Sequence, residues 1–240
     1  MKRAPLYLAL LLLAATSASE AAADGGPGPL GVTTAAVVSA EAARVGALFV
    51  DGEHFCTASV VRSPGRDLIV TAAHCLDEDA GTDDFVFVPG YRDGRSPYGR
   101  WRITERYLPD GWTKGRDEDS DLAFAGLAEQ HGRHIEDVVG GNRFTPGTAT
   151  GATAVTVTGY PNSRATPVRC TNKPVAHSRT QQRIDCPGFS AGTSGSPWVN
   201  GDGDVVGVLG GHEQGGATDD ISYSVVLGAE AAELYRRAAN

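Results

Sequence analysis

The chain has 240 residues, 21% of them charged, and a formal net charge of −8 at neutral pH. This acidic balance lacks the basic stripe that nucleic-acid binding requires, so we expect no nucleic-acid partner. With 31 glycines, 13 prolines and several valine- and threonine-rich runs, the composition favours an all-β globular protein of short strands joined by turns.

The N-terminus reads as an export signal. A basic start at Met1–Arg3 precedes a leucine-rich stretch that ends in small residues at Ala23. This pattern predicts a signal peptide over residues 1–23. The apolar run is shorter than the roughly 18 residues that span a bilayer, so we expect a secreted protein without membrane contact after signal removal. Residues 24–44, rich in glycine and proline and then in small residues, are expected to form a flexible leader or propeptide.

From Val45 onward, short apolar runs alternate with turn residues, as is typical of strands of about 5 to 8 residues. We assign one group of strands to residues 45–135 and a second to residues 136–240, with a polar, glycine-rich connection at 128–150. NGDG at 200–203 predicts a hairpin in the second group. Helix formers after Gly228, with basic residues in the final turn, predict a C-terminal helix.

An even number of cysteines in an exported chain predicts disulfides. The four are Cys56, Cys75, Cys170 and Cys186. Three pairings are possible, and pairing of sequence neighbours would place one bridge in each half. Zinc is the competing use of four cysteines, but none stands in a Cys-x-x-Cys pair, so we expect no metal centre. The acidic runs at 77–84 and 116–121 are expected to be solvated surface, with calcium binding as the alternative.

Three residues stand out as candidates for acyl-transfer chemistry. His74 ends an apolar run directly before Cys75, Asp121 heads the run DLAFAGL, and Ser194 lies in GTSGSP. A serine becomes a nucleophile when a histidine takes its proton and a carboxylate orients the imidazole. The alternatives are a histidine that ends a strand, the last acid of a surface loop and a serine in a turn.

In chain order, TAAHC, DLAF and GTSGSP resemble TAAHC, DIAL and GDSGGP of the chymotrypsin family of serine peptidases. The resemblance covers nearly the whole chain after the leader. It implies two antiparallel six-stranded β-barrels with a C-terminal helix. It also implies Ser194 as nucleophile, His74 as general base and Asp121 as its orienting carboxylate, with the backbone N–H groups of Gly192 and Ser194 as oxyanion hole. An α/β-hydrolase is disfavoured because Ser196 stands where its G-x-S-x-G motif needs glycine.

Three positions depart from the best-known members of the family. Thr193 stands where digestive enzymes carry the aspartate that receives a new N-terminus. VTVTGYP and SGSP resemble the bacterial glutamyl endopeptidase branch, but Leu209 stands where those enzymes have histidine. Gly188 stands where trypsin has aspartate. The sequence therefore indicates neither glutamate nor arginine and lysine specificity.

The resemblance places the first specificity pocket between residues 188–192 and the segment after the second strand of the hairpin. We expect Phe189, Leu209, Gly210 and Gly211 to contribute to it, with Phe189 either a pocket wall or a core residue. Polypeptides are the expected substrates and protein inhibitors the expected further partners of a monomeric enzyme without cofactor. The alternatives are a catalytically silent binding module and an esterase of the same fold.

Overall fold

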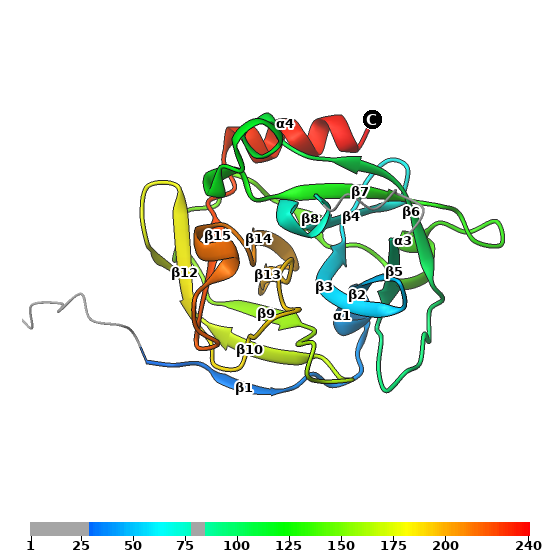
Figure 1. Cartoon of the computed structure of the whole chain (residues 1–240), viewed down its shortest axis with the longest axis horizontal. Coiled ribbons are helices and arrows are strands. Elements are labelled where there is room, and N and C mark those ends of the chain that lie inside the picture. The colour runs from blue at the N-terminus through cyan, green and yellow to red at the C-terminus, as the bar shows by residue number, and fades with distance from the viewer. Residues whose placement is uncertain (1–28, 78–84) are drawn as a thin grey trace, which may run out of the picture.

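The computed structural model describes residues 29–77 and 85–240, so the predicted signal peptide and most of the acidic run at 77–84 lie outside the described residues. Strands dominate the described part, and no helix in it is long and apolar enough to cross a membrane (Figure 1). The strands of the first half are β2 (Val45–Val50), β3 (Glu53–Val60), β4 (Leu68–Thr71), β5 (Val86–Pro89), β6 (Trp101–Tyr107) and β7 (Ala123–Leu127).

These six strands close into an antiparallel barrel in the order β2-β3-β4-β7-β6-β5. Closure removes free strand edges, because β2 pairs with β3 on one side and with β5 on the other. A large apolar cluster belongs to this half, and among its fully buried members are Leu48, Ile69, Phe87, Trp101 and Ile103. The first predicted barrel is confirmed.

The second half is built from two sheets. A six-stranded sheet has the order β1-β10-β9-β13-β14-β8, and a three-stranded sheet has the order β11-β12-β15. The second closed barrel stays a prediction, whereas the hairpin around NGDG is confirmed as β13 and β14. The strands are β1 (Val32–Ala35), β8 (Arg143–Phe144), β9 (Val155–Gly159), β10 (Val168–Asn172), β11 (Val175–Ala176), β12 (Gln181–Asp185), β13 (Pro197–Asn200), β14 (Asp204–Val208) and β15 (Ile221–Val225).

Helical segments are short except at the C-terminus. The predicted terminal helix is confirmed as α4 (Ala229–Ala238), which packs Ala231 and Leu234 into an apolar cluster shared with Phe124 of the first half and Phe144 of the second. This cluster joins the two halves. The other helical segments are α1 (Ala40–Ala43), α2 (Asp110–Gly115), α3 (Ile135–Val139) and the 3₁₀ turns η1 (Ala73–Cys75), η3 (Glu118–Ser120) and η4 (His212–Gly215).

Residues 29–44, hereafter the N-terminal strap, were expected to be flexible but are bound to both halves. β1 pairs with β10 over four residues and extends the sheet of the second half (Figure 1). Farther along, Ala43 is buried in the core of the first barrel, and the carbonyl of Arg44 accepts a hydrogen bond from the N–H of Val60 at 2.8 Å. The strap therefore contributes to the packing between the halves.

Both disulfides join sequence neighbours. Cys56 of β3 is bonded to Cys75 of η1, and Cys170 of β10 is bonded to Cys186 just after β12. Each half thus holds one bridge, and the predicted use of all four cysteines in disulfides is confirmed.

Candidate active site

His74 lies in η1, directly after β4. The strand is fully buried, and the small side chains of Ala72 and Ala73 let the chain turn tightly against the core at its end. The next residue, Cys75, ties the turn to Cys56 on the neighbouring strand. A ring nitrogen of His74 and the two sulfur atoms lie within 4.8 Å of one another. Because both sulfurs belong to a disulfide, they offer no thiolate to a metal ion.

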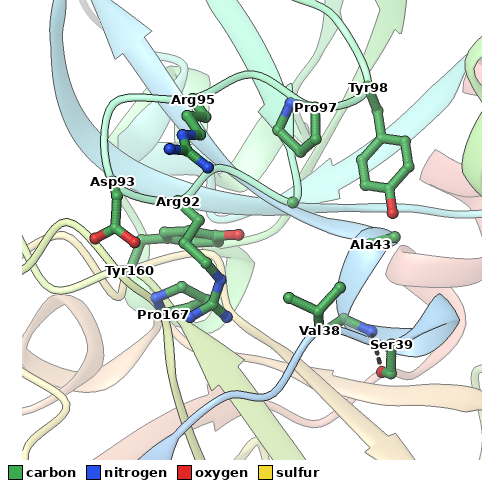
Figure 2. Close-up of a pocket in the computed structure, with 12 residues that line it drawn as sticks. Val38, Ser39, Ala43, Arg92, Asp93, Arg95, Pro97, Tyr98, Tyr160 and Pro167 are labelled. Carbon is green, nitrogen blue, oxygen red and sulfur yellow. Dashed lines mark hydrogen bonds between the residues drawn. The ribbon is translucent and has the colours of Figure 1, made fainter.

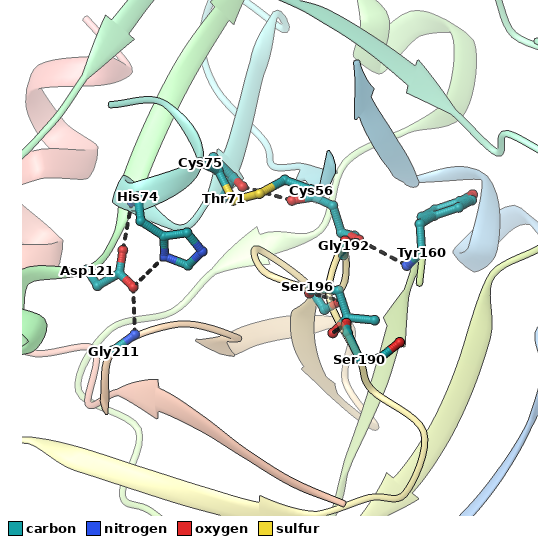
Figure 3. The surroundings of a disulfide bond; sticks show 12 residues. Cys56, Thr71, His74, Cys75, Asp121, Tyr160, Ser190, Gly192, Ser196 and Gly211 are labelled. Atoms are coloured by element: carbon teal, nitrogen blue, oxygen red, sulfur yellow. Dashed lines mark hydrogen bonds and ion pairs between the residues drawn. A yellow bond between two sulfur atoms is a disulfide. The ribbon is translucent and has the colours of Figure 1, made fainter. Parts of the chain in front are cut away.

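Asp121 follows η3 and is completely buried. Three N–H groups compensate for the loss of water around its carboxylate. One carboxylate oxygen accepts the backbone N–H of His74 at 2.9 Å, and the other accepts Nδ1–H of the His74 ring at 2.8 Å and the N–H of Gly211 at 2.7 Å (Figure 3). Since an ionised carboxylate only accepts, the proton of neutral His74 is on Nδ1, and Nε2 is left as a base.

Trp112 of α2 forms part of the surroundings of this imidazole. Its ring centroid lies 6.4 Å from that of His74, at an interplanar angle of 50°. The indole is 3% exposed, and its Nε1–H donates to the carboxylate of Asp77 at 2.7 Å. The His74 side chain is itself only 14% exposed, so packing as well as hydrogen bonding restricts its ring. Sequence reasoning missed Trp112, which stands in a polar and charged stretch of the sequence.

Ser194 lies in a turn of the second half that is hydrogen-bonded to Thr57 of the first. The N–H of Thr57 donates to the carbonyl of Ser194 at 2.7 Å, and its hydroxyl donates to the carbonyl of Gly192 at 2.9 Å. Thr57 directly follows Cys56, whose sulfur lies beside the His74 ring. The same two residues of β3 therefore connect to both the histidine and the serine turn. Thr57 is completely buried and was not singled out by the sequence.

The serine turn places glycine at a position where the backbone conformation excludes a side chain. Gly192 has φ +95°, and a Cβ there would lie 2.1 Å from Oδ1 of Asn162 and 2.6 Å from the carbonyl oxygen of Tyr160. Only glycine fits this position without a shift of its neighbours. In the part of the chain that the structure describes, no protein acceptor is hydrogen-bonded to the N–H of Gly192 or of Ser194.

Thr193 forms hydrogen bonds inside the turn that leads to Ser194. Its N–H and its hydroxyl both donate to the carbonyl oxygen of Ser190, at 3.1 and 2.7 Å. Thr193 is 1% exposed, and its own carbonyl accepts the hydroxyl of Ser196 at 2.6 Å. The turn before Ser194 is therefore formed by local hydrogen bonds.

The four predicted pocket residues have different surroundings. Phe189 and Leu209 are 5% and 3% exposed and belong to the apolar core of the second half. Gly210 donates its N–H to the carbonyl of Tyr223 at 3.0 Å. Gly211 donates to Asp121, a positioning contact that sequence reasoning missed.

Two further histidines, His177 and His212, are stacked on each other next to Gly211, which His212 directly follows in the chain. The rings of His177 and His212 are stacked with centroids 4.8 Å apart, and both meet the ring of Tyr223 edge to face. Nδ1 of His212 lies 3.4 Å from a carboxylate oxygen of Glu118 in η3. This contact connects η3 of the first half to η4 of the second, a short distance along the chain from Asp121.

A separate cavity of about 200 Å³ lies where the N-terminal strap meets both halves (Figure 2). Val38, Pro97, Tyr98 and Tyr160 give it a largely apolar lining, and Arg92 donates a hydrogen bond from its guanidinium to the carbonyl of Ala36. The lining contains none of the predicted site residues, so the cavity is not part of the candidate active site.

A His–Asp pair on a closed six-stranded barrel and a Gly-x-Ser-Gly turn in a second β-sheet half are features of the chymotrypsin-fold serine proteases. The Trypsin-like peptidase domain matches residues 56–208. The chain belongs to this family.

Known relatives agree with this assignment. A glutamyl endopeptidase of Bacillus licheniformis is 29% identical over 138 residues, a match that covers 55% of this chain and 42% of that relative. The chain thus matches less than half of the relative's length. The protease Anisep of Arthrobacter nicotinovorans has a TM-score of 0.75 at 26% identity, over 87% of this chain and 99% of that one. The thermostable serine protease AL20 from an extremophilic microorganism has a TM-score of 0.72 at 25% identity, over 84% and 99% of the two chains.

Proposed function

We propose that the protein is an exported serine endopeptidase that hydrolyses peptide bonds through His74, Asp121 and Ser194. The observation that carries this proposal is the shared attachment at β3. Cys56 is bonded to the turn that holds His74, and Thr57 is hydrogen-bonded to the turn that holds Ser194. This attachment favours a histidine and a serine that act on the same substrate atom.

In the proposed acylation step, Oγ of Ser194 attacks the scissile carbonyl carbon while its proton moves to Nε2 of His74. The resulting imidazolium is stabilised by the buried carboxylate of Asp121, which stays ionised. The negative charge that develops on the substrate oxygen is bound by the N–H groups of Gly192 and Ser194. Collapse of this intermediate breaks the C–N bond, and His74 returns the proton to the leaving amine.

Deacylation repeats these steps with water as nucleophile. His74 takes a proton from water as its oxygen attacks the acyl carbon, and then gives this proton to Oγ of Ser194 as the ester bond breaks. The products are a free carboxylic acid and the original enzyme. The local hydrogen bonds of Thr193 support a turn that is formed without a newly released N-terminus, in contrast to the digestive enzymes.

The wider architecture supports the same proposal. We infer that the two sheets of the second half form the counterpart of the closed barrel and that the substrate binds between the halves. Two disulfides fit an oxidising extracellular environment, in agreement with the signal peptide proposed for residues 1–23. Polypeptides are the proposed substrates.

The test is covalent labelling of the purified, processed protein with a fluorophosphonate, followed by digestion and mass spectrometry. We expect an adduct on Ser194, its loss in Ser194→Ala, and unchanged labelling in Ser178→Ala, which alters a serine in the exposed turn between β11 and β12. Folded protein that gives no adduct would favour a silent binding module. An adduct without internal cleavage of any member of a diverse peptide pool would favour an esterase.

A further inference from the structure

The surroundings of Ser194 restrict where an acyl group can place its side chain. In the proposed mechanism the carbonyl oxygen of the acyl group lies near the N–H groups of Gly192 and Ser194. The first side-chain atom of the acyl residue is only two bonds from the reacting carbonyl carbon, so it lies close to the same turn. Thr57 closes one side, because its N–H and hydroxyl are bonded to the turn. The remaining side is bounded by the chain that enters the turn from Phe189 and by the segment that begins at Leu209.

The backbone of Leu209 is hydrogen-bonded to the serine turn. Its N–H donates to the carbonyl of Ser196 at 2.8 Å, and its own carbonyl accepts the N–H of Gly195 at 2.7 Å. Its side chain extends under η4, since Cδ2 lies 2.5 Å from where a Cβ on Gly215 would be. The backbone of Leu209 is thus fixed on the serine turn, and its side chain occupies space between that turn and η4.

Phe189 is held on the other side of the same region. Its N–H donates to the carbonyl of Asp219 at 2.9 Å, which fixes the backbone from which the ring projects. The ring packs in one apolar cluster with Leu209, Val157 and Trp198. Phe189 and Leu209 are 5% and 3% exposed, so both side chains are packed against protein atoms over nearly their whole surface. Protein interiors are close-packed, so little room remains for a large substrate side chain.

Among the described residues, the acid that most closely precedes Gly188 in the chain is not free to recognise an ionic side chain. Gly188 contributes no side chain, and Asp185, the nearest acid before it, is 5% exposed and paired with Nε of Arg183 at 3.1 Å. The carboxylate of Asp185 is therefore already engaged, and Gly188 offers no charge.

We infer that Phe189 and Leu209 fill the first specificity pocket and limit the protease to substrates with a small residue, such as alanine, on the acyl side of the cleaved bond. This inference rests on the proposed function. A single surplus methylene in an apolar pocket changes kcat/KM by roughly 10- to 200-fold. We expect peptides with alanine at this position to be cleaved at least about tenfold faster than those with leucine.

The test compares peptides that are identical except for alanine, leucine, phenylalanine, glutamate or arginine at the varied position. The wild-type protein is expected to cleave the alanine peptide best. In Phe189→Ala, the ratio of kcat/KM for the leucine and phenylalanine peptides to that for the alanine peptide should rise about tenfold or more. The matched control is Phe144→Ala, which removes a buried phenylalanine from the apolar cluster that joins the two halves and should leave these kcat/KM ratios unchanged.

Failure of the inference and failure of the proposed function give different results. Wild-type protein that takes no fluorophosphonate on Ser194 would overturn the proposed function. Protein that is labelled but cleaves the phenylalanine, glutamate or arginine peptide best would overturn the small pocket alone. If Phe189→Ala fails to fold, Leu209→Ala and the milder Phe189→Leu test the same space, and the wild-type preference decides without any variant.

Discussion

Replacement of Asp121 by asparagine is expected to abolish most activity while the fold is kept. The carboxylate accepts three hydrogen bonds, and an amide of the same shape can accept at only one of its two polar atoms. If the amide nitrogen faces His74 Nδ1, the ring must present a proton on Nε2 and can no longer act as base. If it faces the backbone of His74, two donors meet in a buried site.

Either orientation leaves a buried donor without an acceptor, which costs about 1–3 kcal/mol of stability. The loss in kcat/KM should be larger, about 10⁴-fold as measured for the same change in the Ser–His–Asp template, or about 5 kcal/mol of transition-state stabilisation. The assay is kcat/KM on a cleaved peptide, with thermal unfolding to verify the fold. Asp117→Asn is the control, because Asp117 caps η3 and asparagine caps equally well. An Asp121→Asn variant that keeps more than about a tenth of wild-type activity would refute the proposed role.

Three further predictions concern backbone fit, pH and the N-terminal strap. Gly192→Ala should lower kcat/KM about 100-fold or more because its Cβ would collide with Asn162 and Tyr160, whereas Gly201→Ala, which meets no atom within 4 Å, should be neutral in the same assay. Burial raises the pKa of Tyr160, so its contribution to the free energy of unfolding is complete below the unfolded-state pKa of about 10 and is lost as the pH rises above that value. In urea unfolding, the free energy of unfolding of Tyr160→Phe should therefore decline less steeply above about pH 10 than that of the wild type. Mass spectrometry of the secreted protein should place its N-terminus before Pro29, and a chain that starts after Arg44 should have a lower Tm, because it loses β1 and α1; equal Tm values would contradict a structural role for the strap.

Strong local patterns made much of the fold predictable. The alternation of apolar runs and turn residues gave the strands of the closed barrel, and NGDG gave the hairpin of β13 and β14. The terminal helix followed from its helix-forming residues. In each case the local sequence and the tertiary fold favour the same structure.

Other features depend on contacts that no local pattern encodes. The bond from Gly211 to Asp121 joins residues 90 positions apart through a backbone N–H, which any residue except proline could donate. Thr57 reads as an ordinary strand residue, and its link to Ser194 depends on how the halves pack. β1 is held by main-chain pairing, and its side chains are mostly exposed, so the apolar pattern of a buried strand is missing. The short helix α3 has only five residues, too few for helical periodicity to stand out in the predicted connection.

The same limit applies to the pocket. The resemblance predicts that Phe189 and Leu209 lie near the substrate, and their burial, which the motifs do not encode, is the basis for the inference that they fill the pocket. The inferred specificity therefore depends on side-chain packing that the motifs around His74, Asp121 and Ser194 do not reveal.

The most direct test of the catalytic assignment is a crystal structure of the fluorophosphonate adduct. The account predicts phosphorus bonded to Oγ of Ser194, with the phosphoryl oxygen about 3 Å from the backbone nitrogens of both Gly192 and Ser194. The His74 ring should lie beside the adduct with Nδ1 still bonded to Asp121. Phosphorus on another residue, or a phosphoryl oxygen that points away from both amides, would contradict it.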